Sequence, residues 1–154
     1  MLYLIHKVIK KGEMKMNNSY QYGTYDKPIT RGDILYIHLG NEKKKGLLSG
    51  VHPCLVFSND KGNRRSPTIQ VVPFTSSQLD RKMHQPTHVL VEGFGLPKKS
   101  MALLEQFRTV SKEDVVGYRG HIDMDTHQGK MIMKSIEKAH LISCGISVPM
   151  SMAM

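Results

Sequence analysis

The sequence predicts an α+β fold, in which a small, mostly antiparallel sheet or barrel is followed by one C-terminal helix. Short apolar runs rich in β-branched and aromatic residues recur between residues 32 and 123, separated by Gly, Pro, Asn and Asp. After Asp123 the apolar spacing changes to that of an amphipathic helix. The length of 154 residues suits one domain with a single core.

The strands follow from these runs and the breaks between them. We expect strands at 32–40 (GDILYIHLG), 52–60 (HPCLVFSND), 68–75 (TIQVVPFT), 87–92 (THVLVE), 100–111 (SMALLEQFRTVS) and, more weakly, 117–123 (GYRGHID). Proline cannot donate to a sheet ladder, so Pro53 fits only at the start or edge of its strand. The NDKGN sequence predicts a turn, because Asn, Asp and Gly accept left-handed backbone conformations.

The C-terminal helix has recognisable ends. Asp123 is a suitable N-cap, and apolar or small side chains then recur at i, i+3 and i+4 as far as Ser143. Gly145 is placed to end the helix. The residues before the predicted sheet lack apolar periodicity and contain loop-forming Asn, Gly and Pro.

We therefore expect three regions: a disordered N-terminal tail over 1–29, a folded domain over 30–146 and a disordered tail over 147–154. The Lys-Gly-Glu sequence ahead of Met14 and Met16 is compatible with a purine-rich ribosome-binding site, so either methionine is a candidate start.

Composition excludes some classes of protein. No run approaches the roughly 18 apolar residues of a membrane span, and the opening MLYLIHKVIKK is too short and too polar for a secretory signal. Cys54 and Cys144 lie in apolar contexts without the spacing of a disulfide framework, which favours reduced core residues over a disulfide. These features indicate a cytoplasmic protein without a membrane partner.

Most of the net charge of +9 lies in one part of the chain. Residues 40–99 contain ten Lys and Arg against four Asp and Glu, and so hold most of it. Such a segment indicates either a solvated surface rich in lysine or a face that binds a polyanion such as nucleic acid.

Metal and nucleotide chemistry find little support in the sequence. His84 and His88 have the spacing of a helical zinc pair, but Pro86 between them breaks the helix that would bring both rings to one face. The glycine-rich phosphate-binding motifs of nucleotide-binding proteins are absent from the sequence. We expect neither a metal nor another cofactor.

The order of the motifs resembles a known family. RGDILYIHL, GVHPCLVFSNDKGNRRSPTIQVVPFT, PTHVLVE, SMALLEQFRTVS and the terminal LISCG follow one another with the spacing of MazF/PemK toxin endoribonucleases of type II toxin–antitoxin systems. The resemblance extends from about Arg31 to Gly145, with SNDKGN, SPT, PFT and LLEQFRT as its most specific parts.

This resemblance implies an SH3-like, CcdB/PemK-type barrel that forms a homodimer. It also implies cleavage of single-stranded RNA, such as mRNA, at short sequences without a metal, leaving a 2′,3′-cyclic phosphate and a 5′-hydroxyl. A cognate antitoxin peptide would block the RNA groove. The family pairs an arginine before the proline of the second strand with a threonine that ends the third, and these positions are His52 and Thr75 here.

The histidine changes the chemistry expected of the pair. Arginine is a good phosphate clamp and a poor proton carrier, whereas histidine titrates near pH ~6.5 and can transfer a proton. Another cation would then hold the phosphate; Arg64, Arg65 and Arg108 are candidates, with Arg108 favoured because it lies in LLEQFRT. Alternatively, His52 only forms a local hydrogen bond.

Further residues are expected to contact RNA. Glu105 and Gln106 carry over as base-reading groups, because their carboxylate and amide can bond base edges; the alternative is a cross-strand pair facing solvent. Asn59 is expected to bind RNA near the phosphate. Lys43, Lys44 and Lys45 form either an electrostatic lid or a solvated loop. The KKKGLLSG segment that contains them lacks the polar run of close relatives, so the base preference of those relatives does not carry over to this chain.

Two functions of different classes remain open at this point. The first is the metal-independent endoribonuclease toxin. The second is a catalytically impaired member of the same fold that binds nucleic acid or a protein target such as gyrase, and the histidine at position 52 is the feature that favours it.

Overall fold

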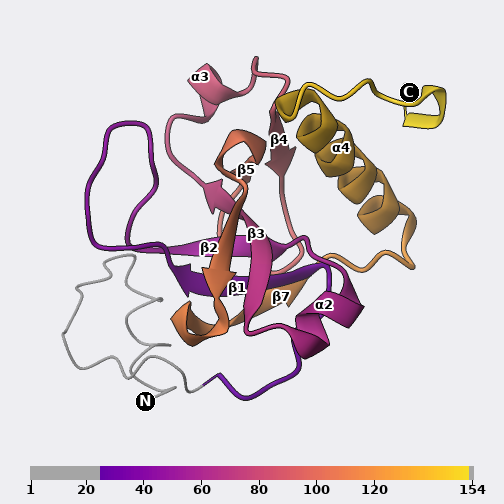
Figure 1. Ribbon diagram of the computed structural model, residues 1–154. Helices are drawn as coiled ribbons and strands as arrows, with labels where there is room; N and C mark the ends of the chain where they lie inside the picture. The colour runs from indigo at the N-terminus through magenta and orange to yellow at the C-terminus, as the bar shows by residue number, and fades with distance from the viewer. Residues whose placement is uncertain (1–24, 153–154) are drawn as a thin grey trace.

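The computed structural model describes residues 25–152 of the chain (Figure 1). The strands are β1 (Asp33–His38), β2 (Val51–Val56), β3 (Thr68–Thr75), β4 (His88–Val91), β5 (Ser100–Leu103), β6 (Arg108–Ser111) and β7 (Val115–His121). The helices are α2 (Asp60–Arg65), α3 (Leu79–Lys82) and α4 (His127–Ser143), with 3₁₀ turns η1 (Leu104–Gln106), η2 (Lys112–Asp114) and η3 (Met150–Met152).

The strands form one antiparallel sheet in the order β4-β5-β3-β2-β1-β7, with β6 also pairing with β3. β3 is long enough to carry two partners along its length, β6 beside its first half and β5 beside its end. Across residues 25–152 no ladder joins β4 to β7, so the sheet is not closed by hydrogen bonds. The predicted α+β class is confirmed, and the barrel is an open one.

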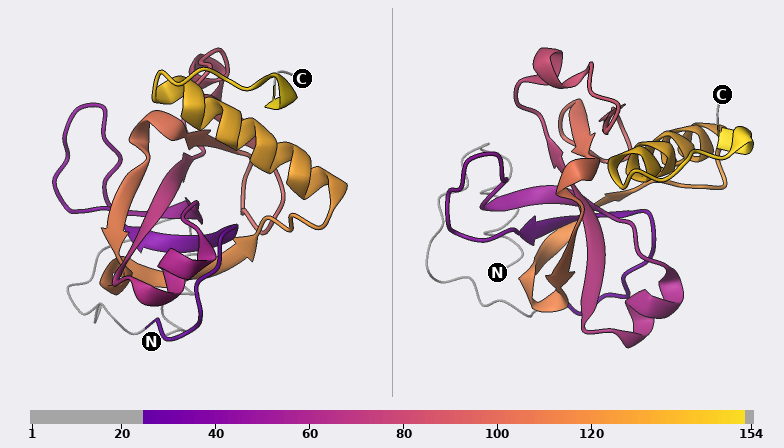
Figure 2. Two further views of the ribbon diagram at one scale, coloured as in Figure 1. Left: turned by 45° about the vertical axis from the view of Figure 1, so that its right-hand side comes forward. Right: turned by 45° about the horizontal axis from the view of Figure 1, so that its top comes forward.

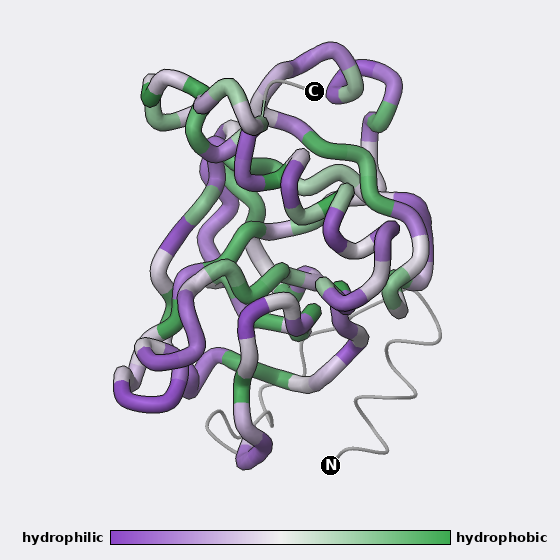
Figure 3. The backbone as a smooth tube through the Cα atoms, turned by 90° about the vertical axis from the view of Figure 1, so that its right-hand side faces the viewer, coloured by the Kyte–Doolittle hydropathy of each residue, from purple (hydrophilic) through white to green (hydrophobic). Residues whose placement is uncertain are grey.

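Both faces of the central strands are buried, which explains their nearly continuous apolar sequences. Successive side chains of a strand point to opposite faces, and in β3 Val72 and Phe74 enter one apolar cluster while Ile69 and Val71 enter another. The first cluster lies beneath α4 and includes its Met133, Ile136 and Ala139. Viewed from the side of α4, hydrophobic stretches run through the middle of the molecule, and hydrophilic stretches predominate in the loops at its lower edge (Figure 3).

Helix α4 packs along one side of the sheet beside β4 (Figure 2). Its N-cap is Thr126, whose hydroxyl accepts a hydrogen bond from the Gly129 amide, so the prediction of Asp123 as N-cap is wrong. Asp123 instead lies in a turn before the helix, where its carboxylate accepts a hydrogen bond from the Asp125 amide. Gly145 follows the helix at φ +69° and ends it as predicted.

Two local predictions differ from the structure. The NDKGN turn continues into α2, because the Asn59 side chain caps the Gly62 amide and the following residues complete a short helix. The single strand predicted over 100–111 is β5 and β6 separated by the turn η1. β5 pairs with the end of β3 and β6 with its first half, and the LEQ residues of η1 connect them as a helical turn within an otherwise extended segment.

The two cysteines differ in environment. Both are free; Cys54 is buried in the second apolar cluster, as expected of a core residue, whereas Cys144 is exposed at the end of α4. No helix in the described part of the chain is long and apolar enough to cross a membrane.

The predicted tails fall partly outside the described residues. Of the N-terminal region, 1–24 lie outside them, including both candidate start methionines, while Tyr25 and Ile29 pack against the second apolar cluster. Of the C-terminal region, 153–154 lie outside, and Met150–Met152 form η3.

Candidate functional site

His52 lies near the start of β2, where this strand has only one neighbour. Ile37 of β1 is opposite it, whereas the ladder with β3 begins at Cys54. Pro53 lies in the same stretch, opposite Tyr36 of β1 and without a partner on the β3 side, in agreement with the edge position predicted for it. His52 Nε2 lies 2.9 Å from the carbonyl oxygen of Ser49, and since a carbonyl only accepts, Nε2 is the donor.

The surroundings of His52 favour the neutral imidazole. Burial is the main cause that lowers its pKa from 6.5, and the positive charge of Arg108 acts in the same direction. The nearby carbonyls of Ser49 and Phe74 oppose this shift, without reversing it. The ring is therefore a neutral base at pH 7 with acceptors nearby that can stabilise its protonated form.

Thr75 is the last residue of β3 and is only 5% exposed. Its hydroxyl oxygen accepts a hydrogen bond of 3.2 Å from the Ser77 amide, which begins the turn toward α3. The β2–β3 ladder ends with Cys54 opposite Pro73, and two further residues in the same register would set His52 opposite Thr75. The Phe74 carbonyl next to Thr75 also acts on the His52 pKa.

Arg108 starts β6, opposite Val71 of β3. Its Nη2 donates to Gln106 Oε1 at 3.1 Å, and its Nε donates to the Gln106 carbonyl at 3.3 Å. The same guanidinium acts on the pKa of both His52 and Cys54, which places its charge on this side of the sheet. Of the three arginines considered from the sequence, Arg108 is the one near His52.

Gln106 connects Arg108 to the loop between β1 and β2. Its side-chain oxygen accepts the Leu48 amide at 3.0 Å, and its side-chain nitrogen donates to the Gly46 carbonyl at 3.0 Å. Both ends of the amide are therefore used inside the protein. Sequence reasoning missed this role, because hydrogen bonds to a loop about sixty residues away leave no local pattern.

Glu105 faces the other way, toward α3 and β4. Its carboxylate accepts from the Thr87 hydroxyl at 3.1 Å and lies 2.6 Å from His88 Nε2. Glu105 and Gln106 are therefore neighbours in sequence whose side chains form hydrogen bonds on opposite sides of η1.

The remaining RNA-contact candidates lie in two other places. Lys43, Lys44 and Lys45 are exposed in the loop that projects at the left of Figure 1, where Lys44 pairs with Glu42 at 3.2 Å between exposed side chains. The other three, Asn59, Arg64 and Arg65, belong to α2 and its cap, beyond the opposite end of β2 from His52. The structure does not bring this second group to the His52 site.

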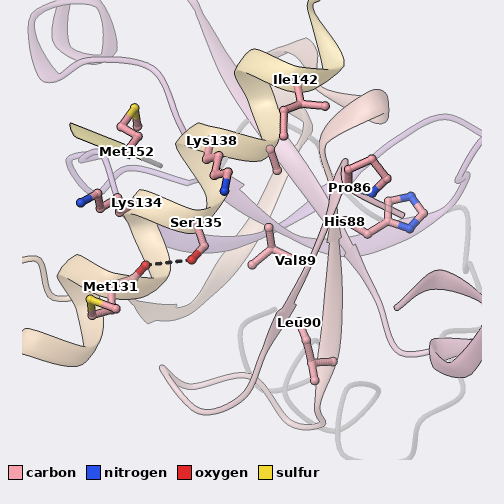
Figure 4. Close-up of a pocket in the computed structure, with 11 residues that line it drawn as sticks. Pro86, His88, Val89, Leu90, Met131, Lys134, Ser135, Lys138, Ile142 and Met152 are labelled. Atoms are coloured by element: carbon pink, nitrogen blue, oxygen red, sulfur yellow. Dashed lines mark hydrogen bonds between the residues drawn. The ribbon is translucent and has the colours of Figure 1, made fainter. Parts of the chain in front are cut away.

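Two hollows lie on either side of β4. One, of about 490 Å³, separates β4 from α4 and is lined by Val89, Leu90, Met131 and Ile142 together with Lys134 and Lys138 (Figure 4). The other, of about 350 Å³, is polar and is lined by Glu105 and residues of the α3 region. His88 contributes to both. Within residues 25–152 no group of three or more His, Cys, Asp or Glu is arranged to hold a metal ion.

Known proteins resemble this chain in sequence and in fold. Endoribonuclease EndoA of Bacillus subtilis (strain 168) is 34% identical over 124 residues, 77% of this chain and 96% of that protein. Endoribonuclease MazF of Staphylococcus epidermidis is 38% identical over 91 residues, 55% of this chain and 70% of that protein. MazF from Deinococcus radiodurans superposes with a TM-score of 0.60 over 79% of this chain and 100% of that one, at 15% identity, and so supports the fold alone.

The family itself is established by its sequence model. Residues 30–132 match the PemK-like, MazF-like toxin of type II toxin–antitoxin systems, which covers most of the described domain. The matched range includes His52, Thr75 and Arg108. The chain therefore belongs to the PemK-like, MazF-like family of toxin endoribonucleases.

Proposed function

We propose that this protein cleaves single-stranded RNA by attack of a ribose 2′-hydroxyl on the neighbouring phosphate, without a metal ion. The observation that carries the proposal is the convergence of three groups: a neutral imidazole, a hydroxyl and a guanidinium. The register of β2 and β3 directs His52 toward Thr75, and Arg108 is near enough to influence the His52 pKa. Such a set can supply a base and two donors to a phosphorane.

In the proposed reaction, His52 takes the proton of the 2′-hydroxyl. The 2′ oxygen then bonds to phosphorus and the bond from phosphorus to the 5′ oxygen breaks. The carbonyls of Ser49 and Phe74 favour the imidazolium that forms, and this imidazolium returns the proton to the departing oxygen. Arg108 and Thr75 donate hydrogen bonds to the phosphate oxygens as charge develops. The products are a 2′,3′-cyclic phosphate and a 5′-hydroxyl.

The ends of the RNA fragments test this route. Polynucleotide kinase should label the new 5′ ends directly, because they carry a hydroxyl. Fragments that need phosphatase treatment before labelling would contradict attack by the 2′-hydroxyl, since hydrolysis by an external water leaves a 5′-phosphate in many nucleases.

A second candidate function rests on the hydrogen bond from His52 to Ser49. A ring held by a residue three positions away can be purely structural, and the protein would then bind nucleic acid or a protein target without cutting. Incubation of the wild-type protein with RNA separates the two, because the second function predicts binding without cleavage.

The partners follow from the same proposal. One structure with this fold is an endoribonuclease in complex with its cognate antitoxin from Mycobacterial species, and another is a MazE–MazF complex from Deinococcus radiodurans. We infer a cognate antitoxin peptide for this chain, a symmetric homodimer and a cytoplasmic location. Light scattering across micromolar concentrations should return twice the mass of the 17.4 kDa chain; a monomer mass throughout would contradict the dimer.

A further inference from the structure

The side chain of Gln106 binds two parts of the chain at once. Its Oε1 accepts hydrogen bonds from the Leu48 amide at 3.0 Å and from Arg108 Nη2 at 3.1 Å, while its Nε2 donates to the Gly46 carbonyl at 3.0 Å. An amide oxygen has two lone pairs, and both are used here. The side chain therefore links the start of β6 to the loop between β1 and β2, and it retains one N–H donor for another partner.

The segment 46–50 of this loop carries the carbonyl that bonds to His52. Gln106 binds the segment at Leu48. The next residue is Ser49, whose carbonyl accepts from His52 Nε2 at 2.9 Å. At its other end the segment is closed by two backbone hydrogen bonds, 2.7 and 2.8 Å long, to the residues that follow β1. The position of the His52 ring therefore depends on a segment that Gln106 holds in place.

The guanidinium of Arg108 is oriented by the same residue. Its Nη2 and its Nε both bond to Gln106, one to the side chain at 3.1 Å and the other to the backbone carbonyl at 3.3 Å. Two such bonds fix the plane of the guanidinium, which a single bond does not. A guanidinium has five N–H donors in a fixed fork, so those that are not bound to Gln106 stay available to a phosphate.

The turn η1 directs Gln106 toward these partners. Successive side chains of a 3₁₀ turn lie about 120° apart. Glu105 accordingly bonds to Thr87 and His88 on the side of β4, whereas Gln106 bonds on the side of the loop. Of these two neighbours in sequence, Gln106 is the one that bonds to a residue of the proposed cleavage site, Arg108.

We propose that Gln106 is the positioning residue of the cleavage site, which fixes Arg108 directly and the His52 ring through the loop. The inference rests on the proposed RNA cleavage and adds to it the residue that aligns the base with the phosphate-binding cation. It replaces the base-reading role that the resemblance implies for Gln106, because both lone pairs of the amide oxygen are bound within the protein. A displacement of about 1 Å at reacting groups can slow a reaction roughly 10²-fold.

The kinetics of Gln106→Met test the proposal. Methionine has a similar length but can replace none of the three side-chain hydrogen bonds. The substrate is a short RNA that spans one cleavage position, mapped beforehand in a long single-stranded RNA cut by the wild-type protein. The variant should lower kcat roughly tenfold or more and leave KM close to its wild-type value, because RNA still binds while the reacting groups are displaced. Gln70→Met, at an exposed position of β3, is the matched control and should keep the wild-type kcat.

The fragment pattern distinguishes positioning from base reading. Primer extension along the long RNA maps every cleavage position. If Gln106 positions the reacting groups, Gln106→Met should slow all positions by a similar factor and cut at no new ones. Gln106→Glu keeps an acceptor for Leu48 and Arg108 and loses the donor to Gly46, so its kcat should lie between those of the wild type and Gln106→Met.

A double substitution tests whether Gln106 acts through Arg108. In the Arg108→Lys background the paired hydrogen bonds to Gln106 are already lost. Gln106→Met should therefore cost less in that background than in the wild type, because the effects of residues in contact are not additive. The same loss in both backgrounds would show that Gln106 does not act through the guanidinium.

The outcomes separate this inference from the function on which it rests. A wild-type kcat in Gln106→Met, or an altered set of cleavage positions, would overturn the positioning role and leave RNA cleavage untouched. If Gln106→Met does not fold, Gln106→Glu carries the same test, and a wild-type kcat in that variant would overturn the role. Failure of the wild-type protein to cleave RNA at all would count against the proposed function itself.

Discussion

His52 Nε2 donates a hydrogen bond to the Ser49 carbonyl across 2.9 Å, which fixes the imidazole against the loop that precedes β2. Burial of the same ring lowers its pKa from 6.5, so it is neutral at pH 7. An imidazole must be neutral before it can accept a proton as a general base. The hydrogen bond and the pKa shift therefore prepare the ring for this role, and they also make its role testable.

Replacing His52 by Ala should slow RNA cleavage by roughly 10²-fold or more, the usual contribution of a general acid–base group. His84→Ala, which removes an exposed histidine, should cleave at the wild-type rate. His52→Arg should retain cleavage, because it restores the residue that the family resemblance implies at this position. Cleavage by His52→Ala at the wild-type rate would assign His52 a structural role.

The wild-type pH–rate profile carries the same information. Since burial lowers the pKa of His52, kcat/KM should fall as the pH drops below 6.5, through a midpoint lower than that value. His52→Arg should shift or remove this acid limb. A limb that is identical in the two proteins would show that another group titrates.

Thr75→Ala should reduce kcat by roughly tenfold or more, because it removes a donor to the charged phosphorane. Thr75→Ser keeps the hydroxyl and should retain most of the activity. Thr109→Ala, at an exposed position of β6, serves as the matched control. Equal losses in the Ala and Ser variants would point to packing at this buried position instead of the hydroxyl.

Arg108→Lys should lower kcat even though the positive charge is kept. Lysine cannot reproduce the paired hydrogen bonds to Gln106, and it presents a point charge in place of a planar fork to the phosphate. Arg64→Lys on α2 should leave kcat unchanged, because that helix lies beyond the far end of β2 from His52. Steady-state kinetics on one RNA substrate compare the two; equal effects would contradict the assignment of the phosphate-binding cation.

Local sequence patterns predict most of this fold because its central strands are buried on both faces. β3 has the predicted bounds, and Gly145 ends α4 as expected, since each follows from nearby residues. The break between β5 and β6 could not be predicted in the same way. It depends on how both strands meet β3, which is a tertiary relationship.

The candidate site likewise has a part that the sequence predicts and a part that depends on tertiary contacts. The pairing of His52 with Thr75 follows from the family resemblance, and the two residues lie on adjacent strands. The loop contacts of Gln106 and the dyad of His88 with Glu105 join residues that are distant in sequence. His88 was considered only as half of a metal pair, because no local signal connects it to Glu105.

His140 gives a prediction about stability. Its ring packs against Phe57 and Phe107, with ring centroids 5.1 and 4.6 Å away, and burial lowers its pKa from 6.5. A histidine kept neutral in the fold binds protons more readily when unfolded, so stability is present above pH 6.5 and lost as the pH falls through the folded pKa. Denaturant unfolding of His140→Leu should show a smaller loss between pH 7.5 and pH 5 than the wild type.

The groups around His140 do not reverse this expectation. Cys144 Sγ lies 3.9 Å from its Nε2, and Arg31 pairs with Glu137 one turn earlier while stacking on Phe57. The carboxylate of Glu137 is therefore already paired with the guanidinium of Arg31. His84→Leu, at an exposed position, controls for the loss of a histidine. An unchanged pH dependence in His140→Leu would show that His140 does not contribute to it.

The most direct test of the central claim is incubation of the purified protein with a long single-stranded RNA in excess EDTA. The account predicts discrete fragments that begin with a 5′-hydroxyl, because His52, Thr75 and Arg108 would supply the proton transfer and charge stabilisation from the chain itself. His52→Ala, assayed beside it, should leave the RNA largely intact. Intact RNA in EDTA with the wild-type protein, or cleavage that returns only when a divalent metal is added, would contradict the account.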